Sequence, residues 1–311
     1  RRRIPSMEEL IPALYLRGIS TGNMQDALKA LLGPKAKGLS SANVSKLTKI
    51  WEEEYAVWCK RNLQGKHYVY VWADGVYFNV RLNDDRPCLL VIIGALSDGT
   101  KELIAIYDGI RESKLSWQTV LQDLKFRGLT QVPKLAIGDG ALGFWAALEE
   151  EFPSTKKQRC WVHKTSNVLD KLPKCVQADA KRIIHDMYMS PTKDEGIKAL
   201  QRFYSLYEAK HPKACLCLEK DQENLFSFYD FPAKHWQHIR TTNPIESTFA
   251  TIRHRANQTK GCGSRKATLA MVYKLACNAQ RRWRKLKGHQ LIKKLIDGVK
   301  FIDGNEIKKV A

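Results

Sequence analysis

The spacing of hydrophobic residues predicts helices at the start of the chain and a sheet after residue 66. Before that point, apolar residues recur every three or four positions, as they do on the buried face of an amphipathic helix. Glycines and a Gly-Pro pair interrupt this pattern and divide it into separate helices. The predicted helices cover residues 7–17, 24–32 and a segment from near Ser40 through Tyr55.

From residue 67 onward, short stretches alternate between apolar and polar residues with a period of two, which is typical of strands. Residues 88–96 form an almost unbroken apolar run, which suits a strand in the middle of a sheet. Short polar turns separate the first three strands, so we expect an antiparallel meander. The predicted strands cover residues 67–81, 88–96, 102–106, 134–137 and 158–163, and the helices between them cover 115–126 and 141–152.

Three meandering strands followed by alternating helices and strands give the element order of an RNase H-like core. From residue 164 onward, helical spacing interrupted by prolines predicts an all-α insertion. A helix beginning at Asn243-Pro244 and a long basic helix up to Lys287 follow it. We therefore predict an α/β fold, an RNase H-like mixed sheet with an all-α insertion, preceded by a helical segment. The expected divisions are 1–66, 67–163, 164–240 and 241–311.

The charge balance points to a polyanionic partner. The 52 Lys and Arg outnumber the 32 Asp and Glu by 20, which favours nucleic acid. A membrane is disfavoured because the chain contains no apolar stretch long enough to cross a bilayer. Residues 1–66 hold 12 basic and 6 acidic residues, so their helices resemble a DNA-binding helix-turn-helix, with an ordinary helical subdomain as the alternative.

A second basic region lies near the C-terminus. Residues 251–300 contain 14 Lys and Arg and a single acid, Asp297. Because so large an excess cannot be neutralised locally, we expect contacts to DNA backbone phosphates, which supply affinity rather than sequence choice. The candidate DNA-binding residues, with Trp283 among them, are Arg253, Arg255, Lys260, Arg265, Lys266, Arg281, Arg282, Arg284, Lys285 and Lys287.

Three acidic residues stand where an RNase H-like core would carry out phosphoryl transfer. Asp74 lies in the first predicted strand, Asp139 at the carboxyl end of the fourth, and Glu246 in the first turn of a late helix. Clustered carboxylates of this kind can hold two Mg²⁺ ions. Each has a structural alternative: a hairpin turn at Asp74-Gly75, a helix N-cap at Asp139, and a capping box formed by Asn243, Pro244 and Glu246.

Cys160 and His163 form a Cys-x-x-His pair, which is half of a zinc site. Cys215-x-Cys217 could supply the other half, although Cys-x-Cys is a poor chelating spacing. The structural alternative packs Cys160 in the core and leaves His163 at the end of a strand. The sequence alone leaves these interpretations open.

Five short motifs occur in order along the chain: Asp74-Gly75-Val76-Tyr77, Leu124-Lys125-Phe126-Arg127-Gly128-Leu129, Gly138-Asp139-Gly140-Ala141-Leu142-Gly143, Gln158-Arg159-Cys160-Trp161-Val162-His163-Lys164 and Thr242-Asn243-Pro244-Ile245-Glu246-Ser247. Together they resemble the DDE-type transposases of bacterial insertion sequences related to the eukaryotic Mutator elements. The resemblance covers most of the chain. The spacing of the three acids also fits, because the long interval between Asp139 and Glu246 holds the helical insertion typical of this group.

The resemblance implies that Asp74, Asp139 and Glu246 are the catalytic triad and bind two Mg²⁺ or Mn²⁺ ions. It implies cleavage at the ends of an insertion sequence and transfer of the released 3′-OH into target DNA, without a nucleotide cofactor. His163 would contact the scissile phosphate or orient a ligand. Trp236 would stack on a displaced base, unless it packs the insertion against the core. At least a dimer is expected, because both DNA ends must be held together.

Two other functions stay open at this point. An RNase H-like nuclease would share the carboxylates but would need neither terminal-repeat recognition nor strand joining. An inactive, domesticated or truncated derivative would only bind DNA, although the presence of all three acids counts against it. The chain begins with Arg1, lacks a signal segment and has eight scattered cysteines. We therefore expect the C-terminal part of a longer protein of the bacterial cytoplasm, associated with the nucleoid.

Overall fold

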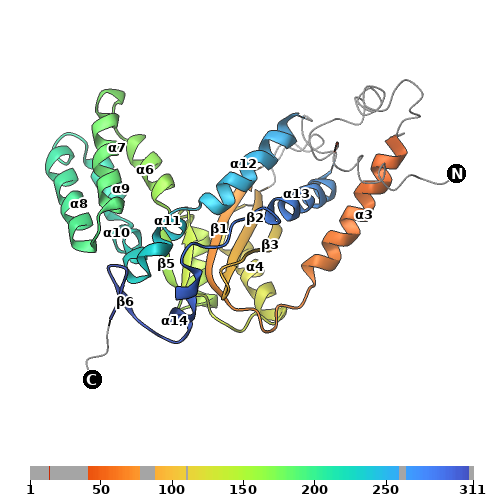
Figure 1. Ribbon diagram of the computed structural model, residues 1–311. Coiled ribbons are helices and arrows are strands. Elements are labelled where there is room, and N and C mark those ends of the chain that lie inside the picture. Colours follow the sequence, from red (N-terminus) through yellow and green to blue (C-terminus); the bar gives the residue numbers. More distant parts are fainter. Residues whose placement is uncertain (1–13, 15–40, 78–87, 110, 259–263, 308–311) are drawn as a thin grey trace.

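The computed structural model describes residue 14 and residues 41–77, 88–109, 111–258 and 264–307. Its centre is a five-stranded sheet with the strand order β3-β2-β1-β4-β5 (Figure 1). The β1–β2 and β2–β3 pairs are antiparallel, whereas the β1–β4 and β4–β5 pairs are parallel. The strands are β1 (Tyr68–Tyr77), β2 (Cys88–Leu96), β3 (Lys101–Gly109), β4 (Leu135–Gly138) and β5 (Lys156–Arg159).

The five predicted strands all exist, but the last one was extended too far. β5 ends at Arg159, and α6 (Trp161–Leu169) begins just after Cys160, so His163 lies on a helix and not at the end of a strand. Trp161, Lys164 and Val168 are the buried residues of α6, a helical spacing that a four-residue motif is too short to reveal. The end of the first predicted strand, residues 78–81, lies outside the described residues.

Alternate residues of β1 point into two separate cores, one on each face of the sheet. Tyr70, Trp72 and Val76 belong to a core shared with α6, α12 and α13. Val71 and Ala73 belong to the other core, shared with α4 and α5. Each face of the sheet is thus covered by helices, and a helix was predicted at each of the four positions. The covering helices are α4 (Lys114–Phe126), α5 (Leu142–Glu151), α12 (Asn243–Gln258) and α13 (Arg265–Gln280).

Only helices occur between β5 and α12, as predicted, and they gather at the β5 end of the sheet (Figure 1). An aromatic cluster lies within this insertion, where the Trp236 ring is 4.8 Å from Tyr229 and 5.4 Å from Phe228, between centroids. After α6, the helices are α7 (Lys174–Met189), α8 (Lys193–Tyr207), α9 (Pro212–Glu219), α10 (Gln222–Leu225), η1 (Ser227–Asp230), η2 (Ala233–His235) and α11 (Trp236–Ile239).

The helix predicted from near Ser40 is confirmed as α3 (Ser41–Cys59), while the two predicted before it lie outside the described residues. α3 lies beside α13, which also packs against β3 (Figure 1). The Tyr55 hydroxyl donates a hydrogen bond to the Ile106 carbonyl at 2.7 Å. The Tyr273 ring on α13 lies 5.6 Å from Tyr55 and 5.0 Å from Trp58. This end of the helical segment is therefore joined to the sheet.

The long basic helix predicted near the C-terminus is shorter than expected, because α13 ends at Gln280. The following segment turns back over the β2–β3 connection, where Leu286 is buried and its N–H donates to the Gly99 carbonyl at 2.9 Å. The Trp283 indole N–H donates to the Thr248 hydroxyl of α12 at 3.0 Å. These contacts hold the segment against the sheet and α12, so the helical period does not continue.

A buried histidine connects the insertion, β1 and the C-terminal segment. His235 is fully buried, with its Nδ1 2.7 Å from the Tyr70 hydroxyl and its Nε2 2.9 Å from the Gly288 carbonyl oxygen. The chain continues through η3 (His289–Leu291) and α14 (Ile292–Ile296) to an unpredicted hairpin of β6 (Phe301–Ile302) and β7 (Asn305–Glu306). None of the described helices is both long and apolar enough to cross a membrane.

Candidate active site

Asp74 and Asp139 occupy neighbouring positions on β1 and at the end of β4. The parallel register pairs Ala73 with Gly138, so the two aspartates are the next residues on adjacent strands. Asp74 follows Trp72 by two positions and therefore shares its face of the sheet, the one that also carries α12. The sheet register thus brings together two acids that are far apart in the sequence.

The environment of Asp74 is strongly acidic. This residue is 9% exposed. Burial raises the pKa of its carboxyl group to about 7, the negative charges of Asp139, Glu112 and Glu246 add to the increase, and His163 opposes it. A buried carboxylate among like charges is costly unless a proton or a cation neutralises it. The site therefore favours positively charged ligands.

Neither aspartate has the purely structural role considered for it. Asp74-Gly75 lies inside β1, where Asp74 is paired with Val91 of β2, so the two residues do not form a hairpin turn. The N-cap of α5 is Ala141, and the Asp139 carboxylate instead accepts a hydrogen bond from the Ala141 N–H at 2.9 Å. This bond orients the loop that follows β4.

Glu246 approaches Asp74 from the first turn of α12. Ile245, Phe249 and Ile252 are buried in the same core as Trp72 and fix this helix against the sheet. The predicted capping box is wrong in its register, because α12 already begins at Asn243. The Glu246 carboxylate therefore accepts a hydrogen bond from the Thr242 hydroxyl, at 2.6 Å.

His163 and Cys160 stand beside Glu246. The His163 Nδ1 is 3.7 Å from Oε1 of Glu246 and 3.4 Å from the Thr242 hydroxyl oxygen. Hydrogen bonding to Cys160 raises the pKa of His163 to about 9 against the opposing effect of burial, and the charges of Cys160, Glu246 and Asp74 contribute. Burial raises the pKa of the Cys160 thiol, but hydrogen bonds from His163 and Thr242 outweigh it and leave the pKa lowered. His163 therefore brings positive charge to the acidic site near neutral pH.

Within the described part of the chain, Cys215 and Cys217 lie on α9 and do not join Cys160 and His163 in a cluster of potential metal ligands, so the zinc site considered from the sequence does not form. Among the described residues, one group has three potential metal-ligand atoms all within 4.8 Å of one another. Its members are Cys160, His163 and Glu246.

Comparison with known proteins identifies the family. The chain matches the family described as "Transposase, Mutator family" over residues 1–286. It is 50% identical over 288 residues to the transposase for insertion sequence element IST2 of Acidithiobacillus ferrooxidans, covering 90% of this chain and 95% of that protein. It is 46% identical over 303 residues to the transposase for insertion sequence element IS6120 of Mycolicibacterium smegmatis, covering 97% and 93%. The chain belongs to the Mutator family of transposases. This membership confirms the resemblance seen in the sequence motifs.

In this Mutator-family chain, Glu112 was not among the predicted site residues; it precedes Ser113, the N-cap of α4. A Cβ atom at Gly75 would overlap the Glu112 carboxylate, so this side chain lies directly against β1. Successive residues of a strand face opposite sides of the sheet, so Glu112 meets β1 on the side opposite to Asp74, yet its charge still raises the Asp74 pKa. Burial raises the pKa of Glu112, and the charge of Asp139 adds to the increase. A glycine inside a strand, next to a candidate catalytic acid, was the available signal, because it marks a close approach by another group.

Trp236 is held within the aromatic cluster of the insertion. It is half-buried, and its indole N–H donates to the Phe231 carbonyl at 2.8 Å. These contacts correspond to the packing alternative considered for this residue. Stacking on a displaced base stays a prediction.

The candidate DNA-binding residues fall into three groups. Two are already paired with acids of β3 and of the β2–β3 turn: Arg265 forms a two-bond ion pair with Asp108, at 2.7 and 2.9 Å, and Lys285 lies 2.9 Å from Asp98. Lys260 and the side chain of Arg255 lie outside the described residues. The others have exposed side chains: Arg253, Lys266, Arg281, Arg282, Arg284 and Lys287.

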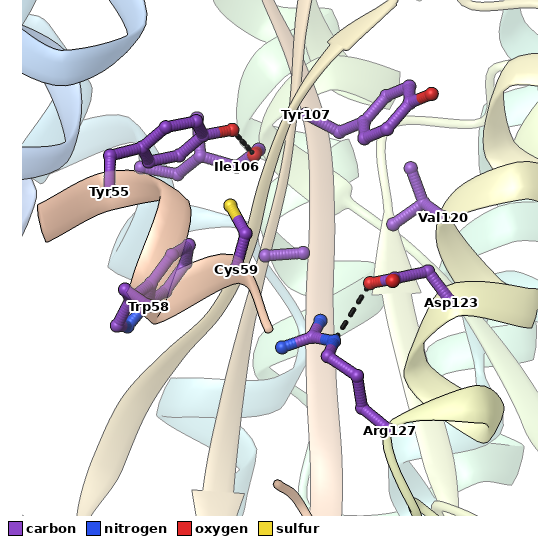
Figure 2. Close-up of a pocket in the computed structure, with 9 residues that line it drawn as sticks. Tyr55, Trp58, Cys59, Ile106, Tyr107, Val120, Asp123 and Arg127 are labelled. Carbon is purple, nitrogen blue, oxygen red and sulfur yellow. Dashed lines mark hydrogen bonds and ion pairs between the residues drawn. The ribbon is translucent and has the colours of Figure 1, made fainter. Parts of the chain in front are cut away.

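A cavity of about 150 Å³ lies between α3, β3 and α4, and none of the predicted catalytic residues lines it. Figure 2 shows the Asp123–Arg127 ion pair at its wall, opposite Tyr55, Trp58 and Cys59. The Arg127 Nη1 is buried without a hydrogen-bond partner, although solvent in the cavity could satisfy it. The cavity is therefore separate from the carboxylate cluster.

Proposed function

We propose that this chain is an insertion-sequence DNA transposase whose active site is formed by Asp74, Asp139 and Glu246. The observation that carries the proposal is the placement of Asp74 and Asp139 on adjacent strands, with Glu246 close enough to raise the Asp74 pKa. Membership in a transposase family supports the DNA substrate. We further propose that the sheet, with its antiparallel β3-β2-β1 half and parallel β1-β4-β5 half, is an RNase H-like core.

The donor set fits divalent metal ions with a preference for oxygen ligands. Asp74, Asp139 and Glu246 supply carboxylate oxygens, and the charges of Asp139, Glu112 and Glu246 raise the pKa of Asp74, an arrangement that divalent cations would stabilise. Two bound Mg²⁺ or Mn²⁺ ions would supply activation of the attacking oxygen and stabilisation of the leaving oxygen. The carboxylates would hold these ions, and the rigid β1–β4 pair fixes the separation of the two aspartates.

The basic surfaces are proposed to hold the DNA. A helix-turn-helix within residues 1–66 would select the element ends, and the exposed C-terminal arginines would contact phosphates. Two DNA ends must be held together for joining, so we propose a dimer or larger assembly on DNA, acting in the bacterial cytoplasm.

Replacing Arg281, Arg282 and Arg284 together with alanine is expected to weaken DNA binding of all sequences alike. Each lost phosphate contact should reduce the slope of log affinity against log salt by about 0.9, hence by up to about 3 for three contacts. Fluorescence anisotropy across a salt series measures this slope. Alanine at the exposed insertion residues Lys181, Arg182 and Lys198 is the matched control, and an equal loss in both variants would contradict an arginine-specific role.

The proposed function is tested by incubating the full chain with labelled element-end DNA and a target plasmid in Mg²⁺. We expect end cleavage and joining, and we expect Asp139→Asn to abolish both. Asp179→Asn, at an exposed residue of α7, removes the same charge far from β4 and should retain activity. A pre-cleaved end separates the steps: cleavage without joining would indicate a nuclease, and DNA binding without chemistry would indicate an inactive binder.

A further inference from the structure

The proposed active site draws its acids from distant parts of the chain. Asp139 follows β4, whereas Glu246 lies on α12, beyond the whole helical insertion. A shared metal site needs these carboxylates at a fixed separation, to within a fraction of an ångström. Something other than the chain connection must therefore set the position of Glu246.

Thr242, the residue before α12, contacts Glu246, His163 and Cys160. Its hydroxyl donates to the Glu246 carboxylate at 2.6 Å, and its oxygen lies 3.4 Å from the His163 Nδ1. Its backbone N–H donates to the Cys160 sulfur at 3.3 Å, and the hydroxyl oxygen is also 3.3 Å from that sulfur. Thr242 and Cys160 are both fully buried, so solvent does not compete for these bonds.

A backbone hydrogen bond joins the Cys160–His163 turn to β4. The Cys160 N–H donates to the Gly138 carbonyl at 2.8 Å, one residue before Asp139. The next amide, that of Trp161, donates to the Arg240 carbonyl at 3.0 Å, just upstream of Thr242. Consecutive amides of this turn thus bond to the strand that carries one catalytic acid and to the segment that leads into the helix carrying the other.

We propose that Cys160, His163 and Thr242 are positioning residues that hold the Glu246 carboxylate in register with Asp139. This proposal rests on the proposed function of the carboxylates and gives the Cys-x-x-His motif a role that the sequence left open. The sulfur accepts a hydrogen bond from the Thr242 amide, the hydroxyl orients one carboxylate oxygen, and the other oxygen is left for a metal ion. Outer-shell partners of this kind tune metal affinity without touching the metal.

A soft metal ion held directly by Cys160, His163 and Glu246 is the competing interpretation. In this interpretation the Cys160 sulfur and the His163 imidazole bind the metal directly. The Thr242 hydroxyl would then be dispensable, and added Zn²⁺ would stabilise the protein by binding to Cys160, His163 and Glu246. In the present geometry the sulfur and the carboxylate are both engaged by Thr242 instead.

The test compares Thr242→Val, which keeps the shape but loses the hydroxyl, with Thr242→Ser, which keeps the hydroxyl. We expect Thr242→Val to raise the Mg²⁺ concentration for half-maximal joining about tenfold or more, and Thr242→Ser to stay within about threefold of wild type. Mn²⁺ binding to the full chain, measured by calorimetry without DNA, should weaken in parallel. Thr268→Val is the control, because this buried hydroxyl bonds to the Ser264 carbonyl beside α13, away from the carboxylates.

Wild-type Mn²⁺ affinity in Thr242→Val would overturn the proposal, as would an equal loss in Thr242→Ser. If Thr242→Val does not fold, Cys160→Ala provides the second variant, and unchanged metal affinity there would also overturn it. Stabilisation by Zn²⁺ that is lost in Cys160→Ala and retained in Thr242→Val would favour the soft-metal site and overturn the positioning role. Joining by the wild type is measured in the same series, so failure of the proposed function is seen separately from failure of this inference.

Discussion

Replacing Asp74 with asparagine is expected to abolish end cleavage and joining while making the metal-free protein more stable. The activity should fall by at least about 10³-fold, because the variant loses a carboxylate that interacts with every other acid of the site. Asparagine keeps the size and shape of the side chain but carries no charge. The variant therefore avoids the free-energy cost of burying a charged carboxylate, and its folded state should be more stable.

The stability gain should depend on pH in a defined direction. The pKa of Asp74 is raised from 3.8 to about 7 in the folded protein, so folding disfavours the charged form. The resulting destabilisation is absent below about pH 4 and complete above about pH 7, where it amounts to at most about 4 kcal/mol. Thermal unfolding of the wild type and Asp74→Asn in EDTA should therefore give similar Tm values near pH 3.5 and a higher Tm for the variant near pH 8.

Added Mg²⁺ should reverse this order. Metal binding stabilises the folded wild type by mass action, and Asp74→Asn should gain less because it binds the metal more weakly. Asp179→Asn, at an exposed position, should follow the wild type in both conditions. A lower Tm for Asp74→Asn in EDTA at pH 8 would show that Asp74 supports the fold rather than straining it.

The sequence predicted the parts of the site that lie on regular, periodic elements. Alternation in β1 placed Asp74 in the sheet, and the order of elements placed Asp139 beside it through the parallel register. His163 was misplaced because a four-residue motif is compatible with a strand end and with the first turn of a helix. The register of Glu246 was off by one residue because Asn243 and Thr242 can both serve as the N-cap of a helix. The helix begins at Asn243, and Thr242 before it is held by its contacts with the distant Cys160.

Glu112 could not be predicted from periodicity at all. It lies between β3 and α4, in a short connection where no regular spacing applies. Its position is set by two contacts across the fold: the carboxylate lies against Gly75, and the backbone carbonyl packs against Gly143 in the first turn of α5. Gly75 marks in the sequence that some group approaches β1 closely, but only the three-dimensional structure identifies Glu112 as that group.

Substituting Gly75 with alanine is therefore expected to reduce joining about 10- to 100-fold with little effect on folding. The new Cβ would overlap the Glu112 carboxylate, which is the free end of a flexible side chain and moves more easily than the strand. Displacing that carboxylate leaves the site with one acidic group out of place, and misplacements of about 1 Å at a reacting centre cost about 10²-fold in rate. The rate of joining and the Tm are measured side by side.

A double-mutant cycle distinguishes this mechanism from damage to β1. Glu112→Ala removes the side chain that the new methyl group would displace, so Gly75→Ala should have almost no further effect in that background. If Gly75→Ala instead reduces joining equally in both backgrounds, the methyl group acts on the strand or on Asp74 directly. The non-additive result would show that Gly75 leaves room for the Glu112 carboxylate against β1, the strand that carries Asp74.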